Sequence, residues 1–280
     1  MKESVTEDTF ILACTSPLAP LVGLCDAMRT SGDVFESWEA ARCMFAANIN
    51  RYFINDYDCM VVREASEEDE LCGRKMVRNI EEIKSYLTAM AYGGGTMMLS
   101  DNMSLLPEEK LRMLSAMFPY NTETAIPLDF TETDIPGILD LGYRGNTRMV
   151  ALINWDEKGR EVSFEIEPSY GFEFWSGTYL GRHEAKISRY IEPHHCEVLF
   201  LTRVAPVAIV GVDDCLYPTI QAFYEDGVLK GSFVKKGETM YLVSQKPIKL
   251  AEGCTCELVS SGEGQLYKIG YTGEMDFTVK

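Results

Sequence analysis

The chain has 280 residues, 46% of them hydrophobic and 25% charged, proportions typical of a globular protein with one large or two ordinary domains. Its formal net charge of −17 argues against nucleic acid and anionic membrane as partners, because both would repel it. No apolar run approaches the length of a membrane span, and the polar, acidic start is unlike a signal peptide. We therefore expect a cytoplasmic protein, or a chain whose true amino terminus lies elsewhere.

Up to about residue 121, short apolar runs alternate with helical patterns. Strands are predicted over 9–14, around 27–29, over 57–62 and over 96–99. Helices are predicted over 38–53, over 76–87, and from Pro107 to just before Pro119. This order predicts a parallel sheet or a (β/α) barrel. A complete eight-stranded barrel needs about 200 residues or more, so the four strands amount to half of one.

From about residue 126 the period changes to that of short strands separated by turns, without a helical pattern. These strands are predicted over 139–143, 149–153, 162–166, 198–201, 207–212, 220–224, 231–234, 240–243, 256–259 and 267–271. Regular short strands with turn signals between them indicate an antiparallel β-sandwich. We expect an α/β domain over 1–121 and an all-β domain over 122–280, in which 204–280 continue the same sandwich or form a separate β module.

The residues that suggest chemistry follow the second predicted strand. Arg29 and Asp33 lie near its carboxyl end, the edge at which barrel enzymes carry their active sites. Spacing alone leaves two interpretations open, because an arginine beside an aspartate is also a common structural ion pair.

The surrounding segments resemble glycoside hydrolase family 36, the α-galactosidases within clan D. The stretch "MRTSGDVFESW" resembles that family's R-x-S-x-D-V…W segment, and "FILACTSPLAP" resembles the preceding barrel strand. Downstream, "INDYDCMVVR" is similar to its N-D-P-D-x-L segment, with Tyr57 in place of proline. "AMAYGGGTMMLSDNMSLLPEEKLRMLSAMFP" resembles the last strand and helix, and "MVALINWDEKGREVSFEIEPSYGFEFWSGTYLG" the start of the following β domain.

The resemblance implies a fold, an activity and a set of site residues. The fold would be strands 5–8 of a (β/α)8 (TIM) barrel followed by a C-terminal antiparallel β-sandwich. The activity would be hydrolysis of terminal α-galactosides, with retention, in carbohydrate metabolism. Asp33 matches the general acid/base and Arg29 a sugar-contacting arginine, while Trp38, Asp56 and Asp58 would line the substrate site, the two aspartates in a supporting role. The partner would be an α-galactoside oligosaccharide or glycan.

The sequence departs from that family at the catalytic nucleophile. The family carries this aspartate in a K-W-D-type segment of the fourth barrel strand, and no K-W-D segment occurs in the 280 residues. The amino-terminal β domain of the family is also absent. We therefore expect self-association, or a partner chain that supplies the first half of the barrel. Two alternatives stay open: α-galactosyl transfer of the raffinose-synthase type, and an inactive, truncated chain that binds sugar or serves as an accessory.

No pattern calls for a metal or an organic cofactor. The nine cysteines are scattered, and an odd count without a signal peptide favours reduced thiols. Trp155 and Trp175 could stack on sugars, although tryptophans in a sandwich are more often core or edge residues. The Gly-rich run from Tyr92 to Thr96 precedes a strand, which favours a turn or a close backbone approach over phosphate binding.

Overall fold

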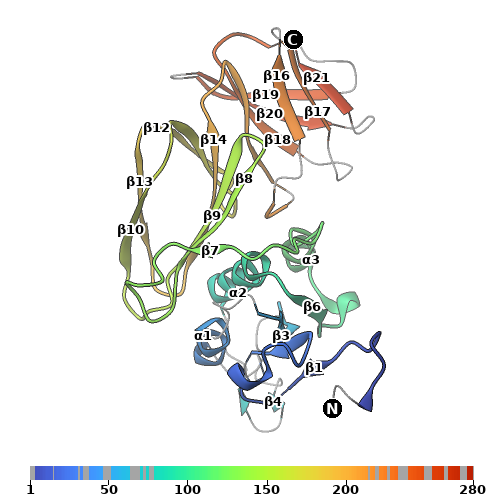
Figure 1. Ribbon diagram of the computed structural model, residues 1–280. Helices are drawn as coiled ribbons and strands as arrows, with labels where there is room; N and C mark the ends of the chain where they lie inside the picture. The colour runs from blue at the N-terminus through green and yellow to red at the C-terminus, as the bar shows by residue number, and fades with distance from the viewer. Residues whose placement is uncertain are drawn as a thin grey trace.

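A computed structural model places an α/β part, a β-sandwich and a second β unit along the chain (Figure 1). The structure describes residues 4–14, 16–30, 32–33, 38–46, 52–63, 70–71, 74–75, 79–213, 215–217, 221–225, 228–232, 239–248, 254–261, 264–271 and 276–279. Within this part of the chain most elements are strands, and no helix is long and apolar enough to cross a membrane.

The α/β part contains a parallel sheet with the strand order β1-β2-β3-β6. Its strands are β1 (Leu12–Ala13), β2 (Ala27–Arg29), β3 (Ile54–Met60) and β6 (Thr96–Leu99). Its helices are α1 (Trp38–Ala46), α2 (Ile80–Gly93) and α3 (Glu108–Ser115). The predicted β-α order is therefore confirmed for the described residues. Two short 3-10 turns (Ala19–Leu21 and Met103–Leu105) and a short hairpin, β4 (Glu70–Leu71) with β5 (Arg74–Lys75), complete the part.

The boundaries of these elements follow from local chemistry. Asn79 caps α2, since its side chain accepts from the Glu82 amide while the Glu82 carboxylate accepts from the Asn79 amide. Helix α2 therefore starts later than the predicted residue 76. It ends at the C-cap Gly94, which has φ 64°. At the next residue, Gly95, φ is +118° and an added Cβ would lie 2.2 Å from the Asn55 carbonyl oxygen. The close-approach interpretation of the Gly-rich run is thus confirmed. Helix α1 is described from Trp38 to Ala46, and 47–51 lie outside the described residues. Residues 52–53, the end of the predicted helix, are not helical.

The β-sandwich follows, with a six-stranded sheet in the order β12-β11-β14-β9-β8-β7 facing the pair β10-β13. The strands are β7 (Ile126–Pro127), β8 (Ile138–Arg144), β9 (Thr147–Ile153), β10 (Arg160–Glu165), β11 (Ser169–Glu173), β12 (Thr178–His183), β13 (Lys186–Ile191) and β14 (Cys196–Arg203). All neighbouring pairs are antiparallel, as predicted. β11, β12 and β13 were not among the strands predicted from sequence.

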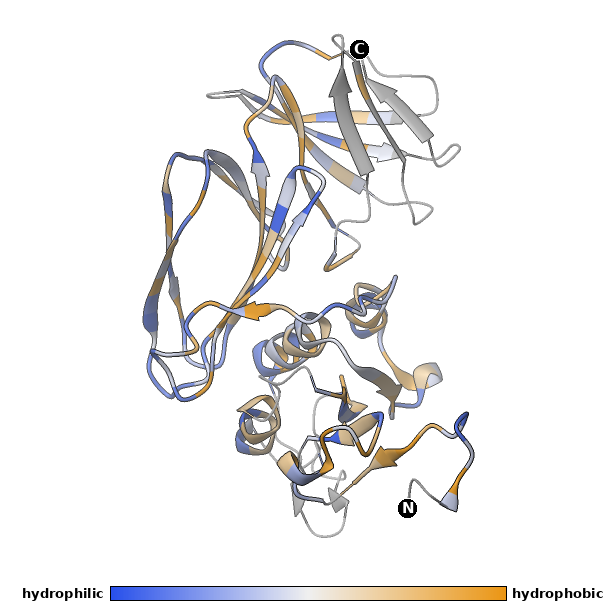
Figure 2. Ribbon diagram, in the orientation of Figure 1, coloured by the Kyte–Doolittle hydropathy of each residue, from blue (hydrophilic) through white to orange (hydrophobic). Residues whose placement is uncertain are grey.

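The six-stranded sheet is buried on both faces. On β9, Val150 and Leu152 face the β10-β13 pair, where they pack with Ile187 and Ile191. Their neighbours Met149, Ala151 and Ile153 belong instead to the core shared with the helices. This double burial explains why β9 is continuously apolar from Met149 to Ile153 (Figure 2).

The second β unit consists of two further antiparallel sheets, β15-β18-β20-β19 and β16-β17-β21. Its strands are β15 (Val207–Val212), β16 (Gln221–Glu225), β17 (Val228–Ser232), β18 (Thr239–Ser244), β19 (Cys254–Ser261), β20 (Gln265–Tyr271) and β21 (Asp276–Val279). The described strands of this unit pair only with one another. Tyr241 of β18 packs on Phe172 of β11, with ring centroids 4.7 Å apart, so the second unit rests against the sandwich.

Candidate active site

The parallel sheet brings three of the predicted site residues together. Arg29 ends β2, and its register partner on β3 is Asp56. The Arg29 Nε lies 3.1 Å from Asp56 Oδ2, and its Nη2 lies 3.1 Å from Asp58 Oδ1. Both aspartates are buried, whereas Arg29 keeps part of its surface exposed. Two of the three guanidinium nitrogens are thus held by carboxylates from the neighbouring strand.

A β-bulge in β3 aims the two aspartates at one arginine. The pairing of β3 with β6 shifts register between Asp56 and Cys59, and Asp58 adopts a left-handed backbone with φ 64°. The Asp58 amide donates to Asp56 Oδ1 at 2.9 Å, and the Thr96 hydroxyl donates to the same oxygen at 3.2 Å. These bonds fix the Asp56 carboxylate before any ligand arrives.

Asp33 approaches the same arginine from the open side. Its Oδ1 lies 3.6 Å from Arg29 Nη1, the longest of the three contacts, and its side chain is 68% exposed. Arg29 Nη1 and the Asp33 carboxylate therefore lie side by side at the open side of the group. A polar group of a ligand could reach both without displacing Asp56 or Asp58.

The site is negatively charged overall. Burial opposes the charge on Arg29, but the hydrogen bond and charge of Asp56, together with Asp58, raise its pKa, so the arginine stays cationic. One positive charge against the three aspartates leaves a formal charge of −2 when all are ionised. Beside them, burial and the Asp58 carboxylate raise the pKa of the Cys59 thiol, which therefore stays neutral. Such a field favours positive charge on a bound group.

Trp38, a predicted substrate-binding residue, lies apart from this group. It is 6% exposed, its indole nitrogen donates to the Trp155 carbonyl at 3.3 Å, and its ring stacks on Trp155 and His194. That environment is the core between α1 and the sandwich. The structure thus places Trp38 as a packing residue, because it belongs to the buried face of α1, which packs on Trp155.

Thr96, whose hydroxyl donates a hydrogen bond to Asp56, was not among the site residues predicted from sequence. The signal that could have found it is its position, since Thr96 opens the strand that neighbours β3 in a parallel sheet. Asp101 proves to cap a loop, accepting from the Val62 amide at 2.6 Å and pairing with Arg63. Among the described residues no cluster of three or more His, Cys, Asp or Glu side chains could hold a metal ion.

No protein-family model matches this chain. Solved structures that resemble it at TM-scores of 0.50 or above include two enzymes. One is a GH27 β-L-arabinopyranosidase from Geobacillus stearothermophilus in complex with arabinose, with a TM-score of 0.51 and 16% identity over 69% of this chain. The other is an isomalto-dextranase from Arthrobacter globiformis T6 complexed with panose, with a TM-score of 0.52 and 14% identity over 99% of this chain.

The chain spans only part of each of these enzymes, 50% of the arabinopyranosidase and 62% of the isomalto-dextranase. At such low identities the likeness concerns the fold and not the activity. The chain is therefore similar in fold to part of the GH27 β-L-arabinopyranosidase and to part of the isomalto-dextranase.

Proposed function

We propose that the Arg29–Asp33 group is the acid/base half of a retaining glycoside hydrolase site of the α-galactosidase type. The observation that supports the proposal most directly is the arrangement of Arg29 with three carboxylates at the ends of two parallel strands. The glycosidase-like fold, and the resemblance of the segment around Asp33 to that of glycoside hydrolase family 36, favour the same conclusion. In this proposal β1, β2, β3 and β6 are strands 5–8 of a (β/α)8 barrel.

The geometry assigns different work to the residues. Asp33, exposed and only loosely bound to Arg29, donates a proton to the leaving glycosidic oxygen and later takes one from water. Arg29 offers Nη1 to a sugar hydroxyl while Asp56 and Asp58 hold its other nitrogens. While Asp33 holds the proton, Arg29 with the ionised Asp56 and Asp58 carries a formal charge of −1, and this charge stabilises the positive charge that develops on the sugar ring in an oxocarbenium-like transition state.

Retention requires a second carboxylate about 5–5.5 Å from the acid, on the opposite side of the sugar bond. Glycoside hydrolase family 36, which the sequence resembles, carries this carboxylate in a K-W-D segment, and this sequence lacks such a segment. We therefore propose that the nucleophile comes from elsewhere, such as a partner chain with the other barrel strands. Without it, one carboxylate cannot both attack the anomeric carbon and protonate the leaving oxygen.

An external nucleophile tests the proposal on the chain itself. Without additive, we expect no hydrolysis of 4-nitrophenyl α-galactoside or raffinose. With sodium azide, nitrogen should bond to the anomeric carbon as the glycosidic C–O bond breaks, which gives β-galactosyl azide. Hydrolysis without azide would show that the nucleophile lies within this chain. If neither substrate yielded the azide product, the enzymatic proposal would be contradicted.

The role of Asp33 is tested with the same two substrates. In the Asp33→Ala variant, azide-dependent turnover of raffinose should fall by about 10²–10⁴-fold, because its leaving oxygen needs a proton. Turnover of the nitrophenyl substrate should fall far less, since nitrophenolate departs unprotonated. Asp134→Ala, at an exposed aspartate before β8, is the matched control. Equal losses on both substrates would contradict the acid role.

One observation favours a second candidate, a sugar-binding chain without catalytic activity. It is the lack of a K-W-D segment, which deprives the site of one of its two carboxylates. Under this hypothesis galactose binds, in a manner dependent on Arg29, but azide yields no product. Titration calorimetry with galactose on the wild type and on Arg29→Met measures this binding, and the azide product separates the two hypotheses.

A further inference from the structure

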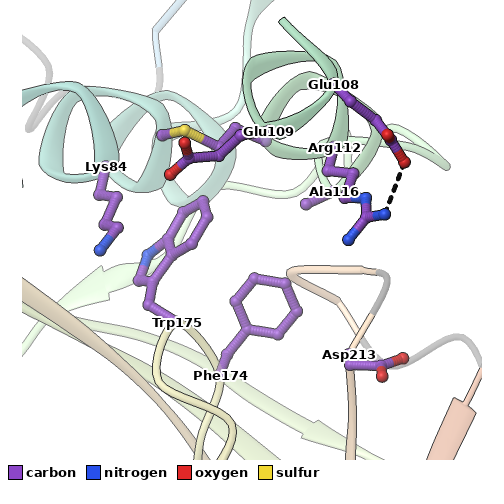
Figure 3. Close-up of a pocket in the computed structure, with 9 residues that line it drawn as sticks. Lys84, Glu108, Glu109, Arg112, Ala116, Phe174, Trp175 and Asp213 are labelled. Carbon is purple, nitrogen blue, oxygen red and sulfur yellow. Dashed lines mark hydrogen bonds and ion pairs between the residues drawn. The ribbon is translucent and has the colours of Figure 1, made fainter. Parts of the chain in front are cut away.

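A cleft of about 430 Å³ lies where the helices meet the two β units. Helices α2 and α3 contribute Lys84, Glu109 and Arg112, and the β side contributes Trp175 and Asp213 (Figure 3). The other lining residues are Glu108, Met113, Ala116 and Phe174. Its volume falls within the usual range of small-molecule sites. None of Arg29, Asp33, Asp56 and Asp58 lines this cleft, so it is separate from the candidate active site.

The loop that carries Trp175 is held rigidly by a buried carboxylate. Glu173, at the end of β11, accepts from the backbone amides of Trp175, Ser176 and Val198 at 2.7–3.0 Å. It also accepts from the Ser176 hydroxyl at 2.6 Å. A carboxylate with four donors fixes the loop that follows it, so the aromatic side chain is positioned before a ligand binds.

The indole of Trp175 is oriented as well as positioned. Its nitrogen donates to the hydroxyl of Thr88 on α2 at 2.9 Å, and its ring meets Phe174 edge-on at 5.1 Å. The donor of the indole is therefore already used, so a ligand in the cleft meets the aromatic ring itself. Figure 3 shows the two aromatic rings rising from the β side towards Lys84, Glu109 and Arg112.

The polar groups around the ring carry both charges. Lys84 and Arg112 are donors, already paired with Glu81 at 2.8 Å and Glu108 at 2.6 Å, while Glu109 and Asp213 add acceptors. An anionic ligand would meet three lining carboxylates and a chain of charge −17. A cationic ligand would meet Lys84 and Arg112. Hydroxyl groups both donate and accept, so a neutral polyhydroxylated ligand satisfies the two kinds of group together.

We propose that this cleft is a second carbohydrate site, which holds a neutral oligosaccharide by stacking one sugar ring on Trp175. Glu109 and Arg112 would bond the hydroxyls that project from that ring. The choice of ligand class rests in part on the proposed function, since a glycosidase site elsewhere on the chain makes a glycan the expected partner. The binding itself requires no catalysis, and its role would be to keep a glycan near the Arg29–Asp33 group.

Tryptophan fluorescence reads this site selectively. The chain has three tryptophans, all described, and Trp38 and Trp155 are 6% and 3% exposed while Trp175 is partly exposed. The full chain is titrated with raffinose and panose as neutral probes, with trigalacturonate as an anionic probe and glucosamine trimer as a cationic one. We expect a saturable change in emission with the neutral probes and a weaker one with the charged probes.

Variants separate a ligand site from mere packing. Trp175→Ala removes the fluorescent reporter itself, so this variant is read by calorimetry, in which binding should weaken by about tenfold or more. Because Trp175 also packs on the core, Glu109→Ala combined with Arg112→Ala provides a second variant at exposed positions, and it should weaken binding severalfold. Arg182→Ala, at an exposed arginine paired with Glu184 on the sandwich, is the matched control and should bind as the wild type.

The outcomes also separate this proposal from the catalytic one. Asp33→Asn should leave the Trp175 signal unchanged, since Asp33 does not line the cleft. No emission change in the wild type, or undiminished calorimetric binding by the Glu109/Arg112 double variant, would overturn the second site whatever the azide experiment shows. A signal lost in Asp33→Asn would overturn it too, because the sugar would then bind at the candidate active site.

Discussion

Arg29 holds three aspartates in two different ways. Towards the protein interior it bonds Asp56 and Asp58 at 3.1 Å each, and towards solvent it meets Asp33 at 3.6 Å. The inner pair fixes the guanidinium, and the outer contact is loose enough for a ligand to enter. Stability and chemistry are thus assigned to different carboxylates of one cluster, which variants can separate.

Replacing Asp56 by asparagine should destabilise the fold. Asp56 is buried and accepts from Arg29, from the Asp58 amide and from Thr96, so loss of its charge leaves a partly buried arginine less compensated. We expect a loss of about 2–4 kcal/mol in the free energy of unfolding. Denaturant unfolding followed by circular dichroism measures it.

The matched change is Asp33→Asn, which alters the same residue type on the exposed side of Arg29. Because the Asp33 side chain is 68% exposed, we expect a change within about 0.5 kcal/mol. If the two variants lost equal stability, Asp33 would be a structural partner of Arg29, and the division of roles in the cluster would be wrong.

Cys59 reports the charge of the inner cluster through its reactivity. Burial and the Asp58 carboxylate raise its pKa, and only the thiolate reacts with iodoacetamide. An ordinary thiol becomes thiolate between about pH 7 and about pH 10. At every pH in this range, Cys59 should therefore react with iodoacetamide more slowly than glutathione does. Asp58→Asn should lower the pKa and speed the reaction, as read by mass spectrometry of the Cys59 peptide.

Thr96→Val controls for loosening of the cluster, since it removes a hydrogen bond to Asp56 and leaves every charge in place. Equal acceleration in both variants would attribute the effect to exposure and contradict the electrostatic explanation.

The candidate site was only partly predictable from sequence. Residues 56 and 58 are two apart in a predicted strand, so their side chains point to the same face of the sheet, and their closeness to Arg29 on the neighbouring strand could be expected. The left-handed backbone at Asp58 could not, because nothing in "INDYDCM" requires a bulge at a non-glycine residue. Trp38 was misplaced, since a motif gives its position in the chain but not the direction in which helix α1 turns it.

Among the elements, predictability followed the burial pattern. β9 and β14 are apolar through most of their length because both faces are covered, and both were found. β11 is also buried throughout, but it contains Gly171 and ends in Glu173, a charged residue with four internal donors. β12 and β13 expose charged side chains at an edge and in a two-stranded sheet. Strand propensity alone does not predict that a charged residue is buried with all its hydrogen bonds made, nor that an edge strand carries exposed charged side chains.

The contact between the sandwich and the second β unit depends on a glycine. A Cβ at Gly211 of β15 would lie 2.3 Å from the ring of Phe172, which is fully buried beside Phe200 and Tyr241. The ring has no space into which to retreat. Gly211→Ala should therefore cost about 1–3 kcal/mol, measured as a fall in unfolding free energy.

Gly32→Ala is the matched control, because an added Cβ there meets no atom within 4 Å. An unchanged or raised stability of Gly211→Ala would mean that the two β units do not pack as described.

At the scale of the whole molecule, the α/β part is covered on one side and open on another. Its helical side joins the sandwich through Trp38 on Trp155, and it joins the segment after β15 through the Tyr217 hydroxyl, which donates to the Ala91 carbonyl at 3.0 Å. Along the sheet the edge strands β1 and β6 each pair with one neighbour among the described strands. Near them several large apolar side chains are exposed, namely Phe10, Leu12, Ile54, Met98 and Leu99.

An open parallel sheet with exposed apolar edges should associate in water. Parallel sheets are normally covered on both faces, and an unpaired edge offers backbone donors and acceptors to another strand. We therefore expect the full chain to self-associate, or to bind a dye for exposed apolar surface until a partner supplies further strands. Light scattering after gel filtration, over a range of protein concentrations, measures the association.

Two double variants locate the associating edge. Phe10→Lys with Leu12→Lys places charge at β1 and should shift the chain towards monomer, because like charges resist edge-to-edge pairing. Leu258→Lys with Val259→Lys makes the same change on β19, an edge strand of the second β unit with two exposed apolar residues, and should leave the association in place. Two results would contradict association through the parallel sheet. One is a wild-type chain that stays monomeric at every concentration and binds no dye; the other is dissociation by the β19 variant but not by the β1 variant.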